Sequence, residues 1–222
     1  MTPLRSLLLT LLCLTSLGAA ESVKPGAKAE LFNGKDLSGW VSHLRDNAPA
    51  DGTWSVKDGL LICTGKPNGF LRTEKSYRQY RFTVEWRFTK PGNTGVVVHM
   101  TPPDAVWPKS VECQGMHKSQ GDFYLWSGAK AKEGTELKDK KTGAVRGYRI
   151  GRAKDGLEKP AGEWNTFTTV CEGDSVVILV NGQEPTASPA STSPKASSAS
   201  SPKAAPSRCA AARSNPSDPR HT

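Results

Sequence analysis

Outside its first 20 residues, the 222-residue chain has no apolar run of the ~20 residues that a membrane-spanning helix needs. This absence excludes a protein that crosses the membrane with helices. Cysteine is also scarce: one of the five lies in each terminal segment, and Cys63, Cys113 and Cys171 fall in predicted strands. We therefore expect three buried thiols, and a disulfide between two of them stays open.

The central part of the chain lacks the strong basic charge of a nucleic-acid-binding protein. The formal net charge is +9, but residues 185–222 contribute +4 and residues 1–20 contribute +1. Residues 21–184 therefore carry only +4, mixed with many Asp and Glu residues. Because a nucleic-acid-binding protein concentrates its charge on its folded surface, we expect no nucleic-acid partner.

The first 20 residues have the pattern of a signal peptide. Arg5 precedes an apolar stretch over residues 7–17, and small residues occupy positions 18–20. Cys13 has no small residue directly before it, whereas a lipoprotein signal has one there. We expect cleavage near Ala20 and a secreted or periplasmic protein without membrane insertion.

The last 38 residues, 185–222, contain no Val, Ile, Leu, Met, Phe, Trp, Tyr or Gly. Ala, Ser and Pro make up 26 of these positions. A segment with nothing to bury cannot offset the entropy that it loses on ordering. The composition therefore predicts a disordered tail.

Residues 21–184 consist of short alternating segments separated by turn residues, without a helical period of useful length. Over residues 80–88, large apolar side chains alternate with polar ones, including Glu85 and Arg87. Sheets with one apolar face stack with these faces inward. The predicted fold is therefore an all-β, two-layer antiparallel sandwich, and its polar outer face suits an extended polar ligand.

Six motifs follow one another in this part of the chain. They are residues 31–40 (LFNGKDLSGW), 54–59 (WSVKDG), 80–88 (YRFTVEWRF), 93–99 (NTGVVVH), 107–114 (WPKSVECQ) and 174–182, which ends in Val180-Asn-Gly. Together they resemble the 3-keto-disaccharide hydrolase domain family over residues 30–184. The resemblance implies a jelly roll of the concanavalin type with a carbohydrate ligand on its concave sheet.

The resemblance also bears on the tail. Family members continue after the Asn-Gly turn into further strands that close the fold, whereas large apolar residues are absent here after residue 184. We therefore expect a jelly roll without its closing strand. Two explanations stay open: residues 185–222 are translated out of frame, or they are a natural linker or tail.

Alternation also decides which side chains face the ligand. Val111 and Cys113 belong in the core, so Glu112 and Gln114 point outward. The same reasoning sends His99 outward. Neighbouring polar and aromatic positions complete the expected substrate-binding patch: Glu85, Arg87, Trp107, Lys109, His117, Asp122, Tyr124 and Trp126.

The chemistry follows from the number of carboxylates. Retaining glycosidases need two at close range, but here Glu112 is followed on its face by the neutral Gln114. The resemblance implies elimination instead. A ketone at carbon 3 acidifies the proton on carbon 2, one base removes it, the group on carbon 1 leaves, and water then adds. We expect Glu112 or His99 to be this base.

Two other functions stay open besides that of an enzyme. The same fold serves non-catalytic sugar-binding modules, and the tail suits the spacer of an adhesion domain. His99, Glu112, His117 and Asp122 lack the spacing typical of zinc ligands, so we expect no metal, and we expect no cofactor.

Overall fold

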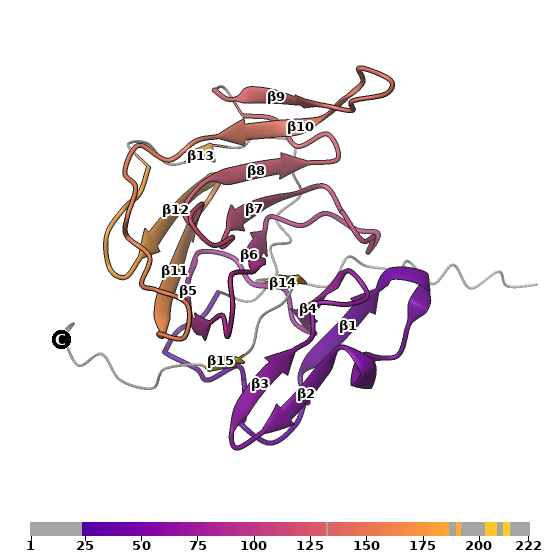
Figure 1. Ribbon diagram of the computed structural model, residues 1–222, viewed down its shortest axis with the longest axis vertical. Coiled ribbons are helices and arrows are strands. Elements are labelled where there is room, and N and C mark those ends of the chain that lie inside the picture. The colour runs from indigo at the N-terminus through magenta and orange to yellow at the C-terminus, as the bar shows by residue number, and fades with distance from the viewer. Residues whose placement is uncertain (1–23, 132, 187–189, 192–202, 208–210, 214–222) are drawn as a thin grey trace, which may run out of the picture.

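The computed structural model describes residues 24–131, 133–186, 190–191, 203–207 and 211–213. The predicted signal peptide, residues 1–20, lies outside them. Two antiparallel sheets form the molecule, with long loops between strands and two short 3-10 turns, η1 (Arg45–Asn47) and η2 (Ala50–Gly52) (Figure 1). This arrangement confirms the predicted all-β, two-layer class. In the described part of the chain, no helix is long and apolar enough to cross a membrane.

The first sheet has eight strands and carries the candidate site. In spatial order its strands are β1 (Trp40–Leu44), β4 (Gly69–Thr73), β14 (Lys203–Ser207), β6 (Asn93–Val98), β7 (Ser110–Gln114), β8 (Phe123–Trp126), β10 (Val145–Ile150) and β9 (Thr135–Lys138). The second sheet has seven: β13 (Ala190–Ser191), β12 (Ser175–Val180), β11 (Asn165–Glu172), β5 (Tyr80–Arg87), β15 (Ala211–Arg213), β3 (Leu60–Cys63) and β2 (Trp54–Lys57).

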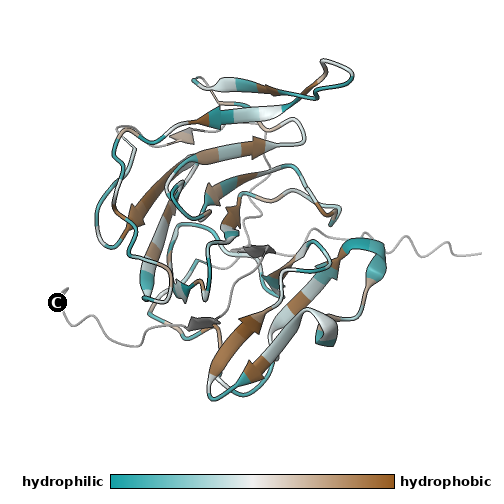
Figure 2. Cartoon of the chain, in the orientation of Figure 1, coloured by the Kyte–Doolittle hydropathy of each residue, from teal (hydrophilic) through white to brown (hydrophobic). Residues whose placement is uncertain are grey.

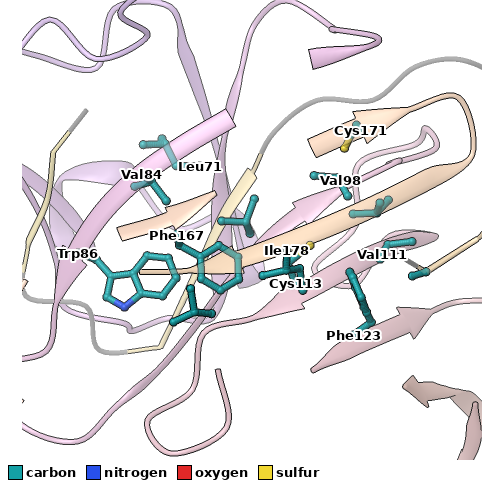
Figure 3. Packing of buried hydrophobic residues seen from close by; sticks show 14 of the residues in the cluster. Leu71, Val84, Trp86, Val98, Val111, Cys113, Phe123, Phe167, Cys171 and Ile178 are labelled. Atoms are coloured by element: carbon teal, nitrogen blue, oxygen red, sulfur yellow. The ribbon is translucent and has the colours of Figure 1, made fainter. Parts of the chain in front are cut away.

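The core lies between the two sheets. Trp86 of β5 packs against Phe167 of β11 with ring centroids 4.8 Å apart (Figure 3). The first sheet contributes Val111 and Phe123, which are fully buried in the same cluster. The apolar alternation predicted for residues 80–88 therefore faces inward, because one face of each strand is removed from water while the other is not.

Cys63, Cys113 and Cys171 are buried, as the sequence predicts, and none of them forms a disulfide with another described cysteine. Burial raises the pKa of the Cys171 thiol to about 12, and it raises that of Cys113 well above its usual value. Both thiols therefore stay protonated and behave as small apolar core residues.

The hydropathy of the residues follows the two-layer arrangement of the sheets (Figure 2). The strands around the core carry hydrophobic bands, whereas the hairpin of β9 and β10 and most connecting loops are hydrophilic. The tip of this hairpin, residues 139–144, is almost entirely exposed.

The tail differs from its prediction at the ten residues that form β13, β14 and β15. The backbone of β14 pairs with β6 over five residues and with β4 over two, and β15 lies between β3 and β5. The prediction of disorder weighed only side-chain burial, but a strand ladder is made by backbone groups that any extended segment can supply. The tail thus adds strands to both sheets, where the sequence predicted a missing closing strand. The other predicted tail residues from 187 onward lie outside the described chain, and their frame of translation stays a hypothesis.

Candidate functional site

The outer face of the first sheet is set by strand register. Val97, Glu112, Tyr124 and Arg149 are successive cross-strand partners on β6, β7, β8 and β10, so their side chains share one face. Trp126 lies on the same face, two residues from Tyr124 along β8. We call the surface formed by Glu112, Tyr124, Trp126, Arg149 and Trp107 the Glu112 face.

Glu112 lies at the base of this face. The residue is only 4% exposed, and the indole Nε1 of Trp126 donates a hydrogen bond of 2.7 Å to its Oε2. Burial raises the pKa of the Glu112 carboxyl to about 7, although the Trp126 hydrogen bond opposes the shift. The group therefore exchanges its proton near neutral pH, as a general base must.

Gly95 on β6 makes room for this carboxyl. A Cβ atom at residue 95 would lie 2.8 Å from Oε1 and 3.0 Å from Cγ of Glu112. Any larger residue would therefore push the carboxyl out of its place.

Three aromatic rings lie beside the carboxyl. Tyr124 stacks on Trp126 with centroids 5.6 Å apart, and Trp107 is 5.3 Å from Trp126 on its other side. Trp107 is 41% exposed, and its carbonyl accepts a 2.7 Å hydrogen bond from the Ser127 hydroxyl. Exposed rings next to polar groups form an amphipathic surface that suits the apolar face and the hydroxyls of a sugar.

Arg149 is held in place from behind by Asp122. The Asp122 carboxylate is 1% exposed and accepts hydrogen bonds from Arg149 Nε at 2.8 Å and from Arg152 Nη1 at 3.0 Å. Because the Arg149 side chain is still 43% exposed, a fixed cation faces solvent on the Glu112 face.

Sequence reasoning missed both arginines. It predicted Asp122 as a substrate contact, whereas the structure uses this carboxylate to hold Arg149 and Arg152. The signal that could have found Arg149 is the short alternation of Tyr148, Arg149 and Ile150, in which the two apolar residues pack against the core. Arg152 follows the strand, and alternation says nothing of it.

Glu85 and Arg87 do not join this face, so their predicted convergence with Glu112 is wrong. Both lie on β5, which belongs to the second sheet and pairs with β11. Arg87 lies over the ring of Trp164 instead, 5.0 Å from its centroid. Alternation gives the side of a strand but not the sheet that holds it, which is why the sequence misplaced them.

His99 is also placed differently from its prediction. The strand ends at Val98, and His99 follows it with φ of 52°, so the alternation no longer applies. Burial lowers the pKa of His99, and the acidic group that opposes this effect is Asp174, at the turn between β11 and β12 of the other sheet. These observations leave Glu112 as the candidate base.

The remaining predicted residues divide between the face and its surroundings. Gln114 is 6% exposed on the face of Glu112, and its Oε1 accepts a hydrogen bond from the Met116 amide. Lys109 lies just before β7, and its carbonyl accepts a hydrogen bond from the Thr101 amide. His117 turns away to Glu158, with 2.6 Å between Nδ1 and Oε1.

The side chains of Glu112, Asp122 and His117 thus have different partners. Glu112 is bonded to Trp126, Asp122 to the two arginines, and His117 to Glu158. Among the residues that the structure describes, no group of three or more His, Cys, Asp or Glu side chains could hold a metal ion.

The fold is a two-layer antiparallel sandwich of the jelly-roll class. One of its outer faces carries a buried carboxyl beside aromatic rings and an arginine, a combination that suits the binding of a carbohydrate. Residues 27–207 match the 3-keto-alpha-glucoside-1,2-lyase-like domain, and the chain belongs to this family of carbohydrate-active proteins.

Solved structures agree on the fold. Two proteins of Parabacteroides distasonis ATCC 8503, described provisionally as glycosyl hydrolases, are similar to the chain. The first has 20% identity and a TM-score of 0.57, and the match covers 83% of this chain and 95% of that one. The second has 21% identity and a TM-score of 0.55, with 82% and 89% covered. No curated protein matches the sequence at a significant level.

Proposed function

We propose that the protein is an exported enzyme that cleaves the glycosidic bond of 3-keto-disaccharides or 3-keto-glucosides by elimination. The observation that carries the proposal is the single carboxyl of Glu112, whose pKa is raised to about 7 on a face lined by aromatic rings. The residue two positions along this face is the amide Gln114, so the strand offers one base and no second carboxylate.

The proposed reaction begins with the sugar stacked on Trp107 and Trp126. The Glu112 carboxylate takes the proton from carbon 2, and the electron pair moves onto the carbon 3 oxygen as an enolate. Arg149 stabilises this oxyanion, because its guanidinium is charged and held in position by Asp122.

The enolate then collapses. Its electron pair forms a double bond between carbons 1 and 2, the bond from carbon 1 to the leaving oxygen breaks, and protonated Glu112 returns its proton to that oxygen. Water adds across the double bond in a later step and yields the free 3-keto sugar. The sequence of steps needs no oxidant, because the ketone is already present in the substrate.

The test is turnover of a 3-keto-glucoside. We expect Glu112→Gln to lower kcat/KM by about 10²–10⁴-fold, the usual contribution of a general base. Glu136→Gln, at an exposed carboxyl on β9 of the same sheet, is the matched control and should keep full activity. Full activity of Glu112→Gln would remove this residue from the mechanism.

Deuterium from solvent distinguishes elimination from direct displacement. Elimination followed by hydration places solvent deuterium on carbon 2 of the product, whereas direct displacement leaves the original hydrogen there. A wild-type protein that binds the 3-keto-glucoside without turning it over would instead indicate the sugar-binding module.

Export has its own test. Cleavage after Ala20 predicts that the mature chain begins at Glu21, and N-terminal sequencing of protein from the culture medium or periplasm reads this residue directly. Recovery of the full-length chain from the cytoplasm alone would contradict the proposal.

A further inference from the structure

A cavity lies at the end of the β7–β8 hairpin, and none of the five residues of the Glu112 face is among its lining residues. It has a volume of about 590 Å³ and is lined by residues from the loop after β7 and the loop after β10. Arg152 fixes the second loop through Asp122 and the Lys118 carbonyl, and the Pro185 carbonyl accepts hydrogen bonds from the amides of Ala153 and Lys154. The volume is in the range of small-molecule sites, and its walls are held by hydrogen bonds.

Gln120 in the lining has unpaired polar atoms. It is 5% exposed, and among the described residues neither its amide nitrogen nor its amide oxygen has a hydrogen-bond partner. A buried polar group that stays without a partner costs about 1–3 kcal/mol, so a ligand that pairs with this amide would be favoured by removing that cost. Gln120 differs from the other buried side chains of this kind in the described chain because both of its polar atoms are unpaired and it lines a cavity.

The unbalanced charge of the cavity is positive. Both oxygens of Glu158 are engaged, Oε1 with His117 Nδ1 at 2.6 Å and Oε2 with the Lys118 amide at 2.6 Å. Arg152 is paired with Asp122 and Asp155. Among the described residues, the ammonium groups of Lys118 and Lys159 form no salt bridge, and both residues line the cavity.

We propose that this cavity is a second carbohydrate site, which binds a sugar unit that carries a carboxylate, such as a hexuronate. Lys118 and Lys159 bind the carboxylate, and the Gln120 amide turns toward the cavity to donate to one ring hydroxyl and accept from another. This inference rests on the proposed function in one respect only, the choice of a sugar as the ligand. Binding in this cavity needs neither Glu112 nor turnover.

The direct test is calorimetric titration of the full chain with glucuronate. Glucose is the matched neutral sugar, and acetate is the bare carboxylate. We expect glucuronate to bind at least tenfold more tightly than either, with an affinity that falls as salt is added. Equal binding of glucose or of acetate, or no saturable binding of glucuronate, would overturn the proposal.

Two variants test the assigned residues. Lys118→Gln should weaken glucuronate binding at least fivefold, whereas Lys140→Gln, in the exposed β9–β10 turn, should leave it unchanged. Gln120→Leu should weaken binding at least tenfold and raise the Tm, because it removes the unpaired amide. A lowered Tm with unchanged affinity would show that Gln120 serves the fold instead.

Glu112→Gln separates this proposal from the proposed function. We expect this variant to bind glucuronate as the wild type does, even though its turnover of a 3-keto-glucoside is lost. If the wild type shows no turnover but still binds glucuronate, the proposed function fails and the second site stands. Loss of glucuronate binding in Glu112→Gln would place the ligand on the Glu112 face and overturn the second site.

Discussion

At the scale of single residues, the chemistry depends on the cost of keeping one carboxyl away from water. Glu112 is nearly fully buried, and Trp126 supplies the hydrogen bond that the structure shows to its Oε2. Its pKa is raised from 4.5 to about 7, so the folded protein holds this proton more tightly than the unfolded chain does. The same shift that makes Glu112 a base at neutral pH therefore costs stability.

This linkage predicts how stability depends on pH. The contribution of protonated Glu112 is fully present below pH 4.5 and is lost as the pH rises to about 7, a change of about 3 kcal/mol. Glu112→Gln should therefore be more stable than the wild type by about this amount at pH 8 and nearly equal to it at pH 4. Urea unfolding at both pH values measures the difference. If Glu112→Gln changed the free energy of unfolding by the same amount at both pH values, the raised pKa of Glu112 would be contradicted.

The activity should follow the same ionisation. The base acts as a carboxylate, so kcat/KM for a 3-keto-glucoside should rise with pH and level off above about 7. A pH series of initial rates measures the midpoint. A profile that is flat from pH 5 to pH 8 would show that another group removes the proton.

Asp122 is a positioning residue in this arrangement. Asp122→Asn removes the charge that holds Arg149 and Arg152, and we expect a loss of about 3 kcal/mol in the free energy of unfolding. We also expect a lower kcat with a smaller change in KM, because the Arg149 guanidinium is needed most when the oxyanion forms. Asp155→Asn is the control, since this carboxylate is 82% exposed. Equal effects of the two variants would contradict the role of Asp122.

At the scale of elements, neighbouring strands decide where functional groups sit. The carboxyl of Glu112 on β7 has room only because β6 carries Gly95 beside it. Glycine otherwise weakens a strand, so its place in β6 serves the site more than the sheet.

Gly95→Ala tests this contact between strands. The added methyl group would lie 2.8 Å from the Glu112 carboxylate and must displace it, so we expect kcat/KM to fall at least tenfold. Gly52→Ala is the control, because a Cβ there meets nothing within 4 Å. Circular dichroism should show intact sheets in both variants. An active Gly95→Ala enzyme would show that the position of the carboxyl is not critical.

At the scale of the whole molecule, the last two described strands join strands that are distant in sequence. Strand β14 lies between β4 and β6, and β15 lies between β3 and β5. Without them, each sheet would divide into two parts and expose unpaired backbone groups.

A chain that ends at Thr186 tests this arrangement. We expect it to lose a sharp thermal transition and to bind a dye for exposed apolar surface, because two strand positions inside the sheets become empty. Calorimetry and dye fluorescence measure both effects. An unchanged Tm would instead support the disordered tail that the composition predicts.

The sequence alone determined the features that depend on local period. Alternation predicted the all-β class, the buried Val111 and Cys113, and the outward Glu112 and Gln114. These predictions succeed because neighbouring side chains along a strand point to opposite faces whatever the strand pairs with. The ordered motifs also indicated the family, because their order and spacing are properties of the sequence itself.

Only the tertiary structure decided which strands share a sheet. It placed Glu85 and Arg87 on the second sheet, ended β6 before His99, and joined Arg149 to Asp122 across 27 residues of sequence. It also placed β14 and β15 within the two sheets, although their composition offers no large apolar side chain. Such pairings depend on backbone hydrogen bonds between distant segments, and no local pattern of side chains records them.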